Sequence, residues 1–206
     1  MKSRGIFTGV AILIAVAALA IGAQETPKKT TPAAGKMDEK AMMEMMAKYS
    51  TPGPEHKGLE AFAGTWDATA KMWMDPSAPA QESKGVAENK MMLGGRFLEQ
   101  SFEGTFMNQP FTGRGYTGYD LYKKQYVSTW MDSMGTMIVM ATGTGDPSGK
   151  TVTMTGQMDD PMTGKKMDFK QTATVVDPDH NVFEMWMTGP DGKMFKTLEI
   201  HYIRRK

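Results

Sequence analysis

The stretch GTWDATAKMWM, residues 64–74, indicates the fold class, because its apolar side chains recur at every second position. Successive side chains of an extended strand point to opposite faces, so this alternation is typical of a β-strand with one apolar face. The apolar face would hold Trp66, Ala68, Ala70, Met72 and Met74. Polar side chains, from Thr65 to Lys71, would lie on the other face. The stretch therefore predicts a strand that covers a core on one side.

The same two-residue rhythm continues towards the C-terminus, interrupted by turn sequences such as DPSGK (146–150) and GPDGK (189–193). Turns at this short spacing predict an all-β domain, and few gaps could hold a crossover helix, so neighbouring strands should pair antiparallel. We predict about ten strands, near residues 65–74, 84–92, 96–105, 111–120, 125–133, 136–145, 150–158, 166–176, 181–188 and 194–204. Because closure removes exposed sheet edges, we predict an antiparallel up-and-down β-barrel over residues 52–206.

A short helix is predicted directly before the first strand. In PGPEHKGLEAFAG, residues 52–64, Pro54 suits the first helical position and Gly64 is a natural stop. We expect this helix to run straight into the barrel.

A second helix is predicted over residues 37–50, which include the run AMMEMMAKYS (41–50). Met42, Met45, Met46 and Tyr49 share one face at helical spacing. Methionine is a strong helix former and an adaptable packer, so this face is expected to dock on an apolar surface. The alternative is a Cu(I) site, because the soft thioethers of Met42, Met45 and Met46 select that ion.

The N-terminus has the order of a secretory signal peptide, which we place at residues 1–23. Lys2 and Arg4 precede an apolar run from Ile6 to about Ala20, and small residues allow cleavage after Ala20 or Ala23. Residues 24–36 then read as a flexible linker. We therefore expect an exported protein, periplasmic or secreted, without a membrane span after cleavage. The alternative is an uncleaved anchor, because the apolar run approaches the roughly 18 residues that span a bilayer.

Composition excludes several classes of partner and site. Without Lys2 and Arg4, 22 of the 24 basic side chains remain against 23 acidic ones. A near-neutral chain gives no electrostatic reason to expect nucleic acid as a partner. The absence of cysteine excludes disulfides and a lipid-anchored cysteine. The chain also lacks the serine-hydrolase, zinc-protease and phosphate-loop motifs, so nothing positive supports an enzyme.

Four ordered segments carry a resemblance to a known family: PGPEHKGLEAFAGTWDATAKMWMDP (52–76), LGGRFLEQSFEGTFMNQPFTGRGYTGYD (93–120), YVSTWMDSMGT (126–136) and FEMWMTGPDGK (183–193). Over about Pro52 to Arg204 the chain resembles the bacterial domain-of-unknown-function family fifteen seventy-nine. The resemblance implies a lipocalin-like barrel and a frequently exported protein. It assigns no activity and no catalytic residue.

A barrel of eight or more strands has room inside for a small ligand unless bulky side chains fill it. We therefore expect a small hydrophobic or amphipathic molecule in a methionine-rich lumen. The candidate ligand-binding residues are Trp66, Met72, Met74, Arg114, Trp130, Met154, Gln171, Met185 and Met187. Trp66 has a second interpretation as the floor of the barrel, and Arg114 could bind a carboxylate if it points inward.

Two alternative functions stay open at this point. His201 on the last strand resembles, in its late position, the axial iron ligand of haem-binding barrels similar to nitrobindin, so metal or haem binding is one alternative. The other is a barrel with a filled lumen that recruits another protein by its surface. The sequence assigns no cofactor and no oligomeric state.

Overall fold

The computed structural model describes residues 38–160, 163–189 and 191–206, and from Glu39 onward these form one compact unit. Helix α1 spans Glu39–Ser50, helix α2 spans Pro54–Gly58, and the 3-10 helix η1 spans Leu59–Phe62. The strands are β1 Gly64–Met72, β2 Gln81–Met92, β3 Phe97–Phe106, β4 Gln109–Asp120, β5 Gln125–Asp132, β6 Val139–Gly145, β7 Thr151–Asp159, β8 Lys166–Asp177, β9 His180–Thr188 and β10 Met194–Arg204. The predicted signal peptide (1–23) and linker (24–36) lie outside the described residues.

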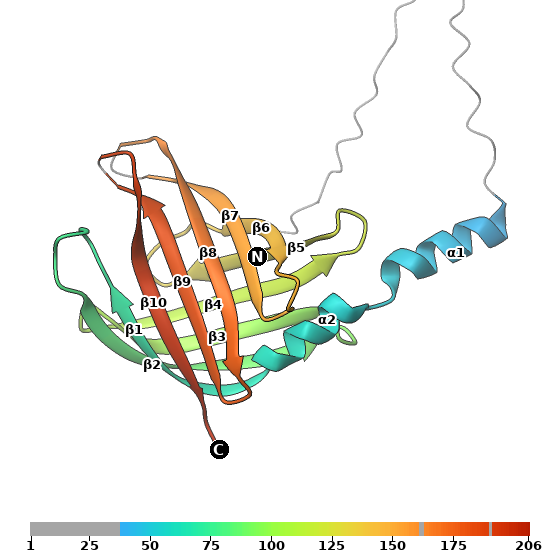
Figure 1. Cartoon of the computed structure of the whole chain (residues 1–206), viewed down its shortest axis with the longest axis horizontal. Coiled ribbons are helices and arrows are strands. Elements are labelled where there is room, and N and C mark those ends of the chain that lie inside the picture. The colour runs from blue at the N-terminus through green and yellow to red at the C-terminus, as the bar shows by residue number, and fades with distance from the viewer. Residues whose placement is uncertain (1–37, 161–162, 190) are drawn as a thin grey trace, which may run out of the picture. The chain divides into compact units, whose positions relative to one another are not determined.

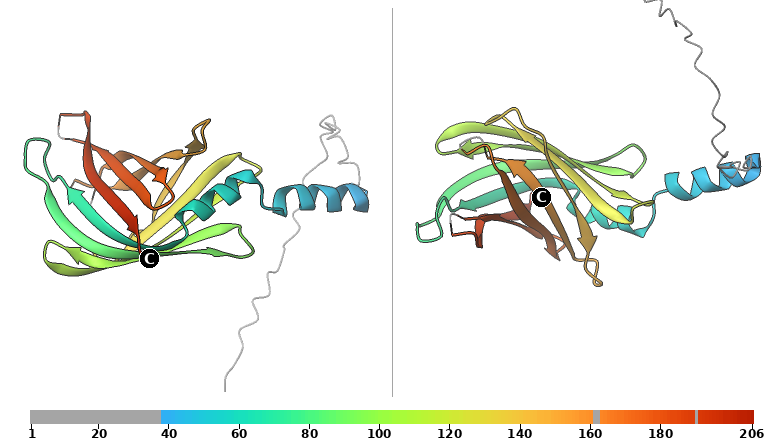
Figure 2. Two further views of the ribbon diagram at one scale, coloured as in Figure 1. Left: turned by 60° about the horizontal axis from the view of Figure 1, so that its bottom comes forward. Right: turned by 90° about the horizontal axis from the view of Figure 1, so that it is seen from above.

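The ten strands close into a barrel in which each strand pairs antiparallel with its neighbours in sequence, and β1 pairs with β10 (Figure 1). The predicted all-β, antiparallel, up-and-down barrel with N-terminal helices is confirmed. Closure satisfies the main-chain groups that the first and last strands would otherwise expose, which removes the edges that promote aggregation. Figure 2 shows the cylinder from two further directions.

The register identifies which side chains face the lumen, because directly opposite residues on neighbouring strands lie on the same face of a sheet. Trp66, Ala87 and Phe102 are successive cross-strand partners and expose 1%, 0% and 8% of their surface, so they mark the inward face. Carrying the register around the ring places the alternate residues of every strand outside. The inward face is therefore the apolar one in β1, as predicted.

Two apolar clusters occupy parts of the interior. One contains Trp66, Ala68, Ala87 and Phe102. The other lies around β5 to β8 and contains Leu59, Leu98, Tyr126, Ala141, Val152, Met154 and Phe169. Because the clusters are separate, the interior is not one continuous apolar core.

Helices α2 and η1 close the end of the barrel where β1 begins and β10 ends (Figure 1). The carbonyl oxygen of Phe62 accepts hydrogen bonds from Trp66 Nε1 at 2.9 Å and from Asn89 Nδ2 at 2.8 Å. Leu59 is 3% exposed and packs into the interior cluster around Tyr126. We call this the closed end and the opposite end, where β1 ends and β10 begins, the mouth.

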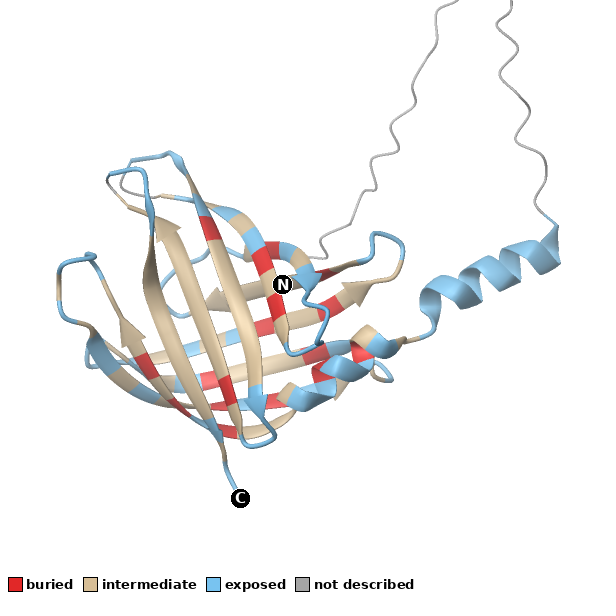
Figure 3. Ribbon diagram, viewed as in Figure 1, coloured by how far each residue is buried: buried red, intermediate tan, exposed pale blue. Residues whose placement is uncertain are grey.

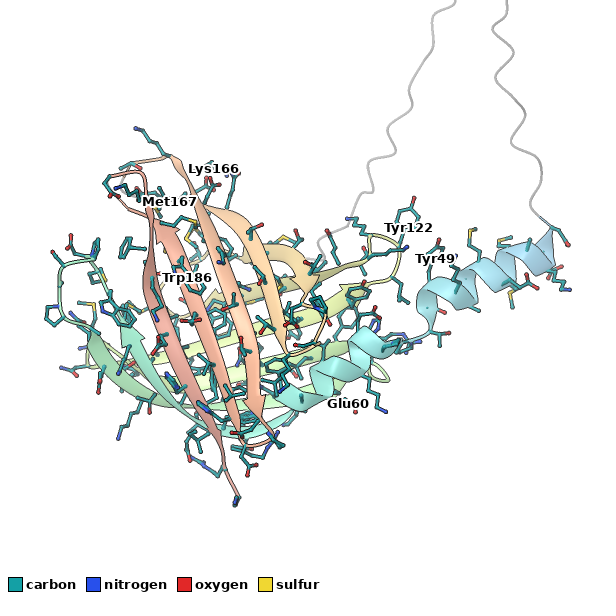
Figure 4. The ribbon with its side chains drawn as sticks, in the orientation of Figure 1. Tyr49, Glu60, Tyr122, Lys166, Met167 and Trp186 are labelled. Atoms are coloured by element: carbon teal, nitrogen blue, oxygen red, sulfur yellow. The ribbon has the colours of Figure 1, made fainter. Side chains whose placement is uncertain are left out.

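Helix α1 buries none of its residues, and its contacts come from its C-terminal turn. The rings of Tyr49 and Tyr122 lie edge to face with centroids 5.5 Å apart (Figure 4), and Arg96 donates a hydrogen bond to the carbonyl of Ser50. The methionine face of α1 is therefore left exposed by the residues that the structure describes. In the part of the chain that the structure describes, no helix is long and apolar enough to cross a membrane.

Candidate functional site: the barrel lumen

The side chains that face the lumen divide into a polar half near the closed end and a methionine-rich half near the mouth. The polar half includes five half-buried residues, which we call the lumen polar set: Gln100, Thr117, Ser128, Gln171 and Tyr202. Near the mouth the inward face carries half-buried methionines: Met72, Met158, Met167 and Met187. The lumen is therefore amphipathic along its length.

Strands β9 and β10 are half-buried over most of their length (Figure 3). Ala173, Phe183 and Met185 face inward and are half-buried. Met158, Met185 and Met187 also pack against the cluster around Tyr126. The inward wall therefore combines packed and partly accessible side chains.

A hydrogen bond crosses the lumen between strands that are not neighbours. Gln171 Nε2 on β8 donates to Ser128 Oγ on β5 at 3.2 Å. The bond passes over the small inward residue Ala141 of β6, which lies opposite Ser128. On the other side of the lumen, the Gln100 amide of β3 acts on the phenol of Tyr202 on β10.

Two buried amide oxygens near the closed end lack a hydrogen-bond donor. They are Oδ1 of Asn89 and Oδ1 of Asn181, whose residues expose 8% and 3% of their surface. The bond from Asn89 Nδ2 to Phe62 fixes the orientation of that amide. A buried acceptor without a partner costs free energy, so both oxygens would gain from a donor.

Charged side chains are nearly absent from the lumen. Among the inward strand residues that the structure describes, the charged ones are Asp132 at the mouth and Arg204 at the closed end. Asp132 accepts hydrogen bonds from Trp130 Nε1 at 3.0 Å and from the amide of Met134 at 2.9 Å. The Asp132 carboxylate therefore already has two hydrogen-bond donors within the protein.

Arg204 stacks over Trp66 with its guanidinium carbon 4.0 Å from the ring centroid. It donates hydrogen bonds to the carbonyls of Ala61, Ala63 and Pro178, and Asp179 lies 3.6 Å away. The arginine therefore joins η1 to the barrel wall, with one N–H of each guanidinium nitrogen donated to a backbone carbonyl.

The lumen tyrosines stay neutral over the physiological range. Burial raises the pKa of the Tyr202 phenol far above its usual value, against the effect of the bond with Gln100. Burial and then the negative charge of Glu55 raise the pKa of Tyr119 and Tyr126. These phenols can donate or accept hydrogen bonds, but they add no charge to the interior.

Comparison with protein families identifies this chain. Residues 51–204 match the family described as protein of unknown function (DUF1579). The chain belongs to the DUF1579 family. No curated protein matches the chain.

A solved structure shares the barrel fold with this DUF1579 chain. The crystal structure of Rv2717c from M. tuberculosis has a TM-score of 0.57 and 14% identity, and the match covers 76% of this chain and 100% of that one. Similarity is lower to a de novo designed fluorescence-activating β-barrel, with TM-score 0.42, 16% identity and coverage of 72% and 97%. The structure of EF1p2_mFAP2b bound to DFHBI gives TM-score 0.40, 14% identity and coverage of 73% and 99%.

Several of the ligand residues expected from sequence do face the lumen of this DUF1579 chain. Met185 and Met187 point inward while Trp186 between them points outward, where Lys170 lies over its ring (Figure 4). The other inward members of the expected set are Trp66, Met72, Trp130, Met154 and Gln171. Trp66 and Met154 are buried in the two clusters, so they support the walls and leave ligand contact to the half-buried residues.

Arg114 does not face the lumen, and the expectation that it would line the site is corrected. It lies on the outer face, where Nη1 donates to Glu99 Oε1 at 2.9 Å. The inward positions of β4 include Gly113 and Gly115, because a Cβ at either would overlap the ring of Trp130. The indole therefore fills the space that inward β4 side chains would occupy.

The residues of the metal and haem alternative are not brought together. Met42, Met45 and Met46 are 45%, 41% and 61% exposed on α1. Met74, which was expected among the ligand-binding residues of the lumen, lies beyond the end of β1 and is 67% exposed, so that expectation is corrected. His201 lies on the outer face opposite Thr69 and Val182, so it does not point into the lumen. The described residues contain no group of three or more histidine, aspartate or glutamate side chains that could hold a metal ion. Cu(I) binding by α1 stays a prediction.

His201 instead belongs to a polar network on the outer face of β9 and β10. Its Nε2 lies 3.0 Å from Glu199 Oε1, and its Nδ1 lies 3.1 Å from His180 Nε2. Lys196 contacts Glu199 and also Glu184, the latter at 3.0 Å. The Lys196 ammonium, helped by His201, holds the pKa of the Glu199 carboxyl below its usual value.

Sequence reasoning missed most of the polar half of the lumen. Gln100, Thr117, Ser128, Asn181 and Tyr202 lie at inward positions of strands whose outward positions are also mixed. The signal that could have found Ser128 is its place two residues before Trp130, on the same strand face.

Proposed function

We propose that this protein is an exported binding protein that holds a small hydrophobic or amphipathic molecule in the lumen of its barrel. One observation carries the proposal: inward residues such as Ala173, Phe183 and Met185 are half-buried inside a closed cylinder. A packed core would bury residues of this kind almost completely. Export is supported by the signal-like order of residues 1–23.

The two ends of the barrel support a single direction of entry. The closed end is held by η1 through Trp66, Asn89 and Arg204. At the mouth, β6 and β7 diverge beyond the pair Thr142–Thr155, and a hollow of about 240 Å³ lies between the ends of these strands. Its lining is Met137, Ile138, Val139, Gln157, Met158 and Asp159. An apolar molecule would therefore meet thioether and aliphatic groups there beside the polar Gln157 and Asp159.

A bulky substitution inside the lumen tests the proposal, with Nile red, a neutral dye that fluoresces in apolar surroundings, as the probe. Ala173 faces inward between Val152 and Phe183, so Ala173→Phe would occupy the space assigned to a ligand. We expect the affinity for Nile red to fall about 10-fold or more, since steric exclusion removes most of the buried contact. The matched control is Thr172→Phe on the outer face of the same strand, which should leave dye binding unchanged.

Urea unfolding of the same variant separates an open lumen from a filled one. In an open lumen Ala173→Phe should change the free energy of unfolding by less than about 1 kcal/mol, whereas overpacking a filled core costs about 1–3 kcal/mol. Strong destabilisation, or dye affinity equal to that of the wild type, would contradict ligand binding in the lumen. The first of these results would favour the barrel with a filled lumen.

A further inference from the structure

The chemistry of the lumen restricts the kind of molecule that it can hold, an inference that rests on the proposed function. Near the closed end the lumen presents amide, hydroxyl and phenol groups of the lumen polar set, which can each donate or accept hydrogen bonds. Nearer the mouth the wall includes Met72, Met158, Met167 and Met187, beside the polar Gln81 and Ser83 of β2. A molecule with one polar end and one apolar end matches this gradient.

The polar end of that molecule should carry no charge. A buried carboxylate or ammonium needs an opposite charge or several strong hydrogen bonds, and without them its burial is very costly. Arg204 already donates to three carbonyls and lies beside Asp179, and Asp132 accepts from Trp130 and Met134. Among the inward strand residues that the structure describes, Arg204 is therefore tied into the closed end and Asp132 lies at the mouth, so no counter-charge lies within the lumen polar set.

The polar end should both donate and accept hydrogen bonds. The amide, hydroxyl and phenol groups of the lumen polar set can each donate or accept. The Oδ1 atoms of Asn89 and Asn181, the cross-strand partners of Gln100 and Tyr202, are fully buried and are not assigned to the head group. A hydroxyl group, which both donates and accepts, suits these surroundings.

We propose that the lumen binds a neutral aliphatic or isoprenoid alcohol, or a close neutral analogue such as a monoacyl ester with free hydroxyls. The molecule enters hydroxyl first, its head lies among Gln100, Ser128 and Gln171, and its chain lies along the methionines of the mouth. A fatty acid of the same length is excluded by the cost of burying its carboxylate.

The test compares three molecules that share one ten-carbon chain and differ only in the head group: decanol, decanoate and decylammonium. Each is titrated at pH 8 against the full chain carrying Nile red, and dye displacement is measured. We expect decanol to displace the dye at a concentration at least about 10-fold lower than either ion, because each ion loses hydration that the lumen cannot replace. Decanoate displacing the dye as well as decanol, or any order other than decanol first, would overturn the inference.

A paired variant locates the head group. Gln171→Leu removes an amide from the lumen and should weaken decanol binding, measured directly without the dye, about 5-fold or more, with Nile red binding measured in parallel. Thr172→Val on the outer face of β8 is the control and should change neither. Equal decanol binding by Gln171→Leu and the wild type would overturn the assigned orientation. Failure of the wild type to bind Nile red at all would instead contradict the proposed function, so the two failures are distinguishable.

Discussion

At the scale of single residues, small inward side chains and unpaired polar atoms shape the lumen. The ring of Trp130 lies over Gly113 and Gly115, so β4 contributes no side chain at the two positions that the indole covers. Near the closed end, Asn181 exposes 3% of its surface and keeps an amide oxygen without a donor. Selection for stability alone would favour an apolar residue there, which is consistent with a role in binding.

Replacing Asn181 by leucine should therefore stabilise the free protein. Removal of the unpaired oxygen relieves its desolvation cost, so we expect the free energy of unfolding in urea to rise by about 1 kcal/mol. Asn89→Leu is the matched comparison, because it removes a similar oxygen but also the bond from Nδ2 to Phe62, and it should gain less or lose stability. A loss of more than about 1 kcal/mol in Asn181→Leu would show that its oxygen has a partner in solution.

Single residues also mark the limit of sequence-based prediction here. The alternation of Met185 and Met187 with a tryptophan predicts that both face the lumen, and their inward register agrees. The prediction for Arg114 is wrong because the inward partners in its strand are glycines, which leave no apolar pattern to read. Apart from Gln171, the lumen polar set was missed for a related reason: in the sequence, a polar residue at an inward position cannot be told from one at an outward position.

At the scale of elements, the alternation of apolar and polar residues was sufficient to place all ten strands. The clearest departures are at the mouth, where β2 begins at Gln81 and β6 at Val139, against predictions of 84 and 136. Gln81 and Ser83 are polar residues on the inward face, so the first residues of β2 lack the alternation of apolar and polar residues that indicates a strand. Residues 133–138 form a loop that includes apolar side chains, and the start of β6 was therefore predicted too early.

The outer network of β9 and β10 makes stability depend on pH. Lys196 lowers the pKa of Glu199, so the ionised carboxylate stabilises the fold above the usual carboxyl pKa of about 4.3, and this contribution is lost as the pH falls through the lower folded-state value. We therefore expect the melting temperature of Glu199→Gln to lie below that of the wild type at pH 7 and to converge with it at acidic pH. Thermal unfolding at a series of pH values measures the difference.

The matched control for this prediction is Glu88→Gln. The pair of Glu88 with Lys90 is 3.8 Å apart, and its side chains are 58% and 73% exposed, so solvent screens it and its loss should be nearly neutral at every pH. A constant difference between Glu199→Gln and the wild type from about pH 7 down to about pH 3 would contradict the proposed ion-pair origin.

At the scale of the whole molecule, a ring of ten strands is wide enough to leave interior space that two separate clusters do not fill. The α2–η1 segment covers one end of the barrel. Flexible methionine side chains line the other end, and thioether chains adapt to varied apolar shapes. The sequence predicted closure from strand number and spacing. It could not predict the amount of open space, because that depends on which side chains of distant strands meet across the lumen, as Gln171 and Ser128 do.

The central claim is that the closed sheet surrounds space that a neutral amphipathic molecule can enter. A crystal structure of the full chain soaked with a decanol brominated at the end of its chain tests this most directly, because the anomalous signal of bromine locates the molecule. We predict a bromine peak inside the barrel beside Met158, Met167 or Met187, with the hydroxyl within hydrogen-bonding distance of Gln100, Ser128 or Gln171. A lumen filled by its own side chains, or bromine bound only outside the barrel, would contradict the account.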